Sequence, residues 1–122
     1  MKRIAAILGI ILVLGFAAQS FGGTPSILSG EKTASALIYT VVPGTTCVIR
    51  TIKVVTDGTN NAKVIVYDSL TATGKVIDET QVIGSNHWGG RAWIDGGIIS
   101  TGIYVDVSGT GASYFVEYYL GE

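Results

Sequence analysis

The residue types best suited to binding chemistry gather in one stretch, residues 86–95. It contains the only histidine of the chain, His87, together with Trp88, Arg91 and Trp93. Aromatic rings with flanking polar groups suit stacking against a sugar, and a guanidinium pairs with acidic ligands. We predict a contact or ligand surface here. The alternative is a strand whose tryptophans fill a core or an oligomer contact, with a bend at Gly89 and Gly90.

Three tyrosines near the carboxyl terminus, Tyr114, Tyr118 and Tyr119, extend the expected contact surface. They belong to the run Ala112–Leu120, which carries aromatic residues on both faces of a predicted strand. Such a strand either lies in the centre of its sheet or contributes one face to a subunit contact.

The sequence gives little support for a metal site or for paired catalytic carboxylates. One histidine without a partnering thiolate set does not make a zinc site, and Asp57, Asn60 and Asn61 do not have the spacing of a calcium loop. The neighbours Asp78 and Glu79 point to opposite faces of a strand, so they cannot act as paired carboxylates. We therefore predict no metal and no cofactor.

The only cysteine, Cys47, lies in a strand-like run and cannot form an intramolecular disulfide. We expect a buried, unreactive thiol. The chain also lacks a Gly-x-Ser-x-Gly elbow and both common glycine-rich phosphate loops. These observations predict a protein that is not an enzyme.

The composition predicts a single all-β domain. The chain has 122 residues, and its 8 basic and 9 acidic residues argue against a nucleic-acid partner. Only 14% of the residues are charged, 48% are hydrophobic and 17 are glycine, which fits neither a disordered chain nor a helical bundle.

Short β-rich runs separated by turn residues fill the chain after residue 33. They are 34–42, 46–56, 62–68, 75–83, 87–94, 98–100, 103–107 and 112–120. No amphipathic helix separates them, so a parallel α/β fold is excluded. We predict an antiparallel β-sandwich or jelly roll of about eight short strands, preceded by a hydrophobic helix at the amino terminus.

The amino terminus has the pattern of a targeting segment. Lys2 and Arg3 precede an uncharged apolar run, and small residues at Ala18 and Ser20 offer a cleavage site. We predict that residues 1–23 are a signal peptide, or alternatively a transmembrane anchor. Residues 24–32 would then be a linker or N-terminal arm, and residues 33–122 a β-sandwich domain outside the cytoplasm.

From Thr56 onward the chain contains five recognisable segments: Thr56–Ala62, Val64–Asp68, Thr71–Gly74, Gly102–Ala112 and Tyr118–Tyr119. Their sequence pattern resembles that of small β-sandwich domains of tailed-phage and other viral structural proteins. In this pattern a strand ends in Tyr-Asp, and a Gly-Ile-Tyr-Val-Asp strand precedes a tyrosine-rich last strand. The resemblance implies a role on a virion surface or in assembly. It brings no active-site residues.

These patterns together predict a non-enzymatic structural protein that is displayed outside the cytoplasm or on a virion. Its partners would be further copies of itself, as a homo-oligomer, or a larger protein shell. The membrane would be a further partner through residues 4–23 if these are not cleaved. The alternative is an extracellular carbohydrate-binding or adhesin-like module that holds a glycan with His87, Trp88, Arg91 and Trp93.

Overall fold

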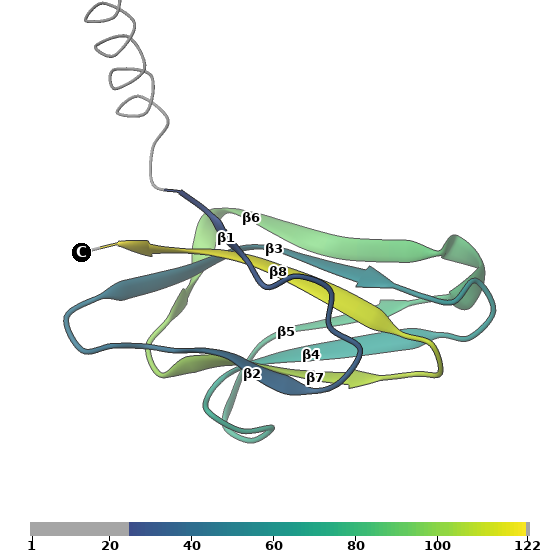
Figure 1. Cartoon of the computed structure of the whole chain (residues 1–122), viewed down its shortest axis with the longest axis horizontal. Coiled ribbons are helices and arrows are strands. Elements are labelled where there is room, and N and C mark those ends of the chain that lie inside the picture. Colours follow the sequence, from purple (N-terminus) through teal and green to yellow (C-terminus); the bar gives the residue numbers. More distant parts are fainter. Residues whose placement is uncertain (1–24, 122) are drawn as a thin grey trace, which may run out of the picture.

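A computed structural model describes residues 25–121, including every side chain except those of residues 93–96. Eight strands form two antiparallel sheets of four strands each, stacked as two layers (Figure 1). The only helical element in this part of the chain is a 3₁₀ turn, η1, at Gly84–Asn86. The all-β prediction is therefore confirmed, whereas the hydrophobic helix expected at the amino terminus lies outside the described residues.

Each sheet draws its strands from the whole length of the chain. The first sheet has the order β1 (Ile27–Leu28), β8 (Ser113–Gly121), β3 (Thr46–Val55) and β6 (Trp88–Ile99). The second has the order β2 (Ala36–Thr40), β7 (Gly102–Ser108), β4 (Ala62–Asp68) and β5 (Lys75–Val82).

The strand pairing is nested. β1 pairs with β8, β2 with β7, β3 with β6 and β4 with β5, each antiparallel. The chain thus folds back along itself as one ribbon, and successive pairs of the ribbon alternate between the two sheets. β8 also pairs with β3, and β7 also pairs with β4, and this pairing joins the strand pairs into two four-stranded sheets. β8 is consequently an internal strand, which explains the aromatic residues on both of its faces.

The core lies between the two sheets and follows the period of two that a strand imposes. Along β4, every second residue from Ala62 to Asp68 is buried. Ile52 and Val54 of β3 belong to the same core cluster as Val105 of β7 in the opposite layer, and all three are almost completely inaccessible to solvent. The same alternation holds in β7 and β8, where Ile103, Val105, Tyr114 and Val116 are buried.

The segment before Thr33 is part of the folded body. Ile27 and Leu28 lie opposite Tyr118 and Glu117 of β8. Lys32 and Tyr114 exchange two backbone hydrogen bonds, each 2.9 Å long. Residues 27–32 therefore form an arm that is fixed to the first sheet.

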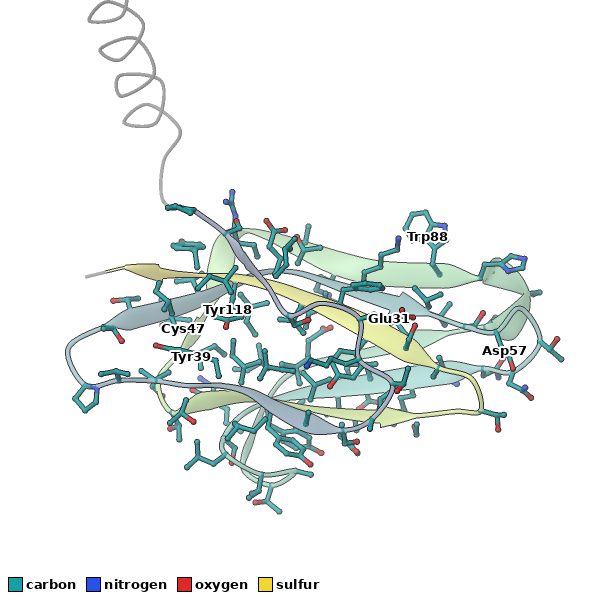
Figure 2. All side chains as sticks on the ribbon, in the orientation of Figure 1. Glu31, Tyr39, Cys47, Asp57, Trp88 and Tyr118 are labelled. Atoms are coloured by element: carbon teal, nitrogen blue, oxygen red, sulfur yellow. The ribbon has the colours of Figure 1, made fainter. Side chains whose placement is uncertain are left out.

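Cys47 is buried between the layers, close to Tyr39 and Tyr118 (Figure 2). Burial, with a smaller contribution from the negative charge of Asp68, raises the pKa of its thiol to about 11. The prediction that this cysteine is buried is confirmed.

This environment predicts a strongly protected thiol. Near pH 8 only about one molecule in a thousand would carry the thiolate at a pKa of about 11, and the reagent must also reach a buried atom. We expect no labelling of the folded chain by a disulfide reagent and complete labelling in denaturant. Rapid labelling of the folded protein would contradict the burial of Cys47.

Candidate interaction surface

The two sheets have four edge strands, of which β6 is the longest. β6 has 12 residues, against two in β1, five in β2 and eight in β5. Edge strands normally carry charged residues that discourage pairing with another chain. β5 follows this rule with Lys75 and Glu79, whereas the sequence of β6 contains only Arg91 and Asp95 as charged residues.

A tight network fixes the point where the chain enters β6. The buried Thr56 donates its backbone N–H to the carbonyl of His87 at 2.7 Å and its hydroxyl to the carbonyl of Gly84 at 2.8 Å. Gly84 in turn donates its N–H to Oδ1 of Asn61 at 3.0 Å. His87 adopts a positive φ of 64°, and these bonds stabilise its uncommon conformation. The turn thereby sets the direction in which Trp88 leaves the loop.

Trp88 projects from the outer face of the first sheet (Figure 2) and is 64% exposed. The ammonium nitrogen of Lys53, on the neighbouring strand β3, lies 5.5 Å from the centre of the Trp88 ring. Beside this pair is a shallow depression of about 260 Å³. It is lined by Thr51, Ile52, Lys53, Trp88, Gly89, Gly90, Arg91 and Ala92.

Arg91 does not join Trp88 on the outer face. It lies opposite Ile52, which is buried, so its side chain belongs to the inner side of the sheet. Its Nε is 3.1 Å from Oδ1 of Asp78 on β5, whose side chain is only 5% exposed. The hydroxyl of Thr80 donates a 2.7 Å hydrogen bond to the other oxygen of the same carboxylate. Arg91 therefore connects the edges of the two sheets: its guanidinium is paired with Asp78, although the residue also lines the depression beside Trp88.

The Arg91–Asp78 pair should contribute measurably to stability. Replacing Arg91 with methionine leaves the buried Asp78 carboxylate without its cation, so we expect a loss of about 2 kcal/mol in the free energy of unfolding. The matched control is Lys63→Met, which removes the exposed Lys63–Glu79 pair at 2.7 Å. Equal effects of the two substitutions in urea unfolding would contradict a structural role for Arg91.

The tyrosines of β8 divide between core and surface. Tyr114 is completely buried, and its hydroxyl donates to the carbonyl of Ala34 at 3.0 Å. Burial, with a smaller contribution from Tyr104, raises the pKa of the Tyr114 hydroxyl to about 12. Tyr118 is also buried, with its ring centre 5.4 Å from that of Tyr39. The expectation that these two tyrosines form a contact surface is therefore wrong, because they point inward from an internal strand.

The other residues of the predicted contact surface lie in different surroundings. Tyr119 is half-buried on the outer face, where the Arg50 guanidinium lies 5.6 Å from its ring centre. His87 is exposed in the turn before β6. The side chain of Trp93 lies outside the described side chains, so its contact role stays a prediction.

Lys53 is the surface residue that the sequence did not indicate. It lies opposite Gly90 in the pairing of β3 with β6, although 37 positions separate the two residues in the printed sequence. Ile98, at the far end of β6, is likewise 67% exposed. Only the strand register brings Lys53 close to Trp88, and no local sequence pattern predicts this contact.

Within the described part of the chain, no three His, Cys, Asp or Glu side chains lie together as a metal-binding group. The same residues include no helix with the length and apolar character needed to cross a bilayer. No protein-family model, curated protein or solved structure matches the chain.

Proposed function

We propose that this protein is a non-enzymatic structural protein that works by associating with further copies of itself or with a larger protein shell. The observation that carries the proposal is β6, the longest edge strand, with Trp88 and Ile98 exposed and few charges along it. Such an edge offers backbone groups and apolar surface to another chain.

The register of β6 indicates which part would pair. Trp88–Ala92 lies in regular register opposite Thr51–Val55, whereas the register shifts between Ile49 and Thr51. Residues 88–92 are therefore the segment best prepared for pairing. Antiparallel pairing of this segment with the same segment of a second copy would join two four-stranded sheets around a two-fold axis.

The nested strand order supports a jelly-roll topology for the sandwich, because the eight strands form one folded ribbon wrapped into two sheets. Jelly rolls occur in viral capsid proteins and in lectins. This agrees with the resemblance to viral structural proteins. We accordingly propose display on a virion or outside the cytoplasm, with residues 1–23 acting as a signal peptide or a membrane anchor.

A charge on the β6 edge should weaken self-association. We expect Ala92→Lys to raise the dissociation constant at least about tenfold, because Ala92 is exposed at the end of the pairing segment and lysine on an edge strand opposes pairing. The measurement is sedimentation velocity of the full-length chain over a range of concentrations, in a mild detergent because residues 4–23 are apolar.

The matched control is Val76→Lys, which places the same charge on the β5 edge at a residue that is also exposed. It should leave the dissociation constant of the wild type unchanged. A monomeric wild-type chain at all concentrations, or equal weakening by the two substitutions, would contradict association through β6.

A further inference from the structure

Beyond self-association, we propose that the depression beside Trp88 binds an acidic sugar, a pyranose ring that carries a carboxylate. The indole of Trp88 would stack on the ring, and the ammonium of Lys53 would pair with the carboxylate. The two groups already lie 5.5 Å apart, from ring centre to Nζ, on adjacent strands.

Trp88 supplies the stacking surface. Tryptophan is normally largely buried, yet here 64% of it faces solvent at the rim of a hollow. An exposed aromatic ring beside a concavity is typical of a binding site. The hydrogen-bond network around Thr56 and Gly84 fixes the backbone before Trp88, so the ring needs little ordering on binding.

Lys53 supplies the charge. Among residues 25–92 and 97–121, no carboxylate lies within ion-pair distance of its ammonium, whereas Lys63 and Arg91 are each paired with an acidic side chain. This ammonium lies over the Trp88 ring, so a sugar that stacks on the exposed part of the ring would bring its carboxylate within reach of the charge. The complementarity favours an acidic sugar over a neutral one.

The floor of the depression is kept open by small residues. A side chain at Gly90 is impossible without moving the backbone, because its Cβ would lie 2.1 Å from the carbonyl oxygen of Ile52. Ala92 continues the shallow floor, and Thr51 adds a hydroxyl that can hydrogen-bond a sugar. The resulting volume of about 260 Å³ is suited to a single sugar unit.

The shape favours a sugar over an acidic peptide, because an extended peptide uses a row of pockets along a sheet edge. Here the hollow beside Trp88 lies on the face of the sheet rather than along its edge. Strand pairing at the β6 edge would continue the sheet sideways and leave this face open. Sugar binding and self-association are therefore compatible.

The test is isothermal titration of the full-length chain with an oligogalacturonate and with a neutral oligosaccharide of equal length. We expect saturable binding of the oligogalacturonate, weakened at least about tenfold in both Trp88→Ala and Lys53→Gln. The matched control is Arg50→Gln, which removes the other cation that lies over an aromatic ring of this sheet. Trp88→Tyr should retain most of the affinity, and it covers the case in which Trp88→Ala fails to fold.

The absence of saturable binding would overturn the proposal, as would binding that neither Trp88 nor Lys53 affects. Equal affinity for the neutral oligosaccharide would reject the acidic class. Binding of a polyglutamate peptide in place of the sugar would reassign the site to an acidic peptide. Sedimentation of the Ala92→Lys variant without sugar measures self-association separately, so failure of one proposal does not imply failure of the other.

Discussion

Replacing Asp68 with alanine is expected to lower the free energy of unfolding by about 3 kcal/mol. Asp68 is only 8% exposed, and its carboxylate accepts hydrogen bonds from the turn between β6 and β7. The donors are the backbone N–H of Thr101 at 2.7 Å, the hydroxyl of Ser100 at 2.8 Å, and the N–H groups of Ser100 and Gly102. Removing the carboxylate leaves several of these groups without a partner.

Urea unfolding of the wild type and of Asp68→Ala measures this loss of stability. The matched control is Asp57→Ala, because Asp57 also accepts bonds from two backbone N–H groups, those of Thr59 and Asn60, but is exposed. Water can replace the lost carboxylate there, so the effect should be clearly smaller. Equal destabilisation by the two substitutions would show that burial of Asp68 adds nothing.

The same carboxylate predicts a dependence on pH. Burial acts to raise the pKa of Asp68, but the hydrogen bonds from Thr101, Ser100 and Gly102 outweigh it and hold the pKa below the ordinary value of 3.8. A lowered pKa means that this stabilisation is complete above the ordinary value and is lost as the pH falls through the lower, folded-state value. The stability difference between wild type and Asp68→Asn should therefore shrink in strong acid.

The second large effect is expected for Gly84→Ala, with a loss of about 3 kcal/mol. An added Cβ would lie 2.3 Å from the carbonyl oxygen and 2.4 Å from the carbonyl carbon of Thr59, which are backbone atoms that cannot simply rotate away. The substitution should separate η1 from the loop before β4. Because η1 also positions Trp88, the tryptophan fluorescence of the folded protein should change as well.

Substitutions at two other glycines distinguish the effect of a steric clash from the effect of an unfavourable backbone conformation. Gly121→Ala meets no atom within 4 Å and should be neutral. Gly44 has open space too, but its φ of +86° is unfavourable for alanine, so Gly44→Ala should destabilise by about 1 kcal/mol. If Gly84→Ala unfolds at the same urea concentration as Gly44→Ala, the contact with Thr59 is not tight.

Local patterns were sufficient to predict most strands. The predicted run 62–68 coincides with β4, where apolar residues alternate and turn residues lie on both sides. β6 was expected as two strands interrupted near residues 95–97, but it is one, because β3 pairs with residues on both sides of the interruption. β1 was missed because it has only two residues and its pairing depends on β8, far along the chain.

The interaction surface could be predicted only in part, since residue type does not determine the face of a strand. Trp88 was singled out from a stretch rich in aromatic and polar residues, and its side chain is exposed. Arg91 lies three positions later and therefore points to the other face, toward Asp78. Lys53 reaches Trp88 through the register of β3 with β6, which is a long-range property of the fold.

Association through β6 is tested most directly by hydrogen exchange of the backbone amides in residues 88–92, measured on the full-length chain at low and at high concentration. Pairing with a second copy would slow exchange of the edge amides of this segment as concentration rises, while the amides of β5 would exchange at an unchanged rate. An assembled protein whose β6 amides exchange as fast as in the dilute chain would contradict the account.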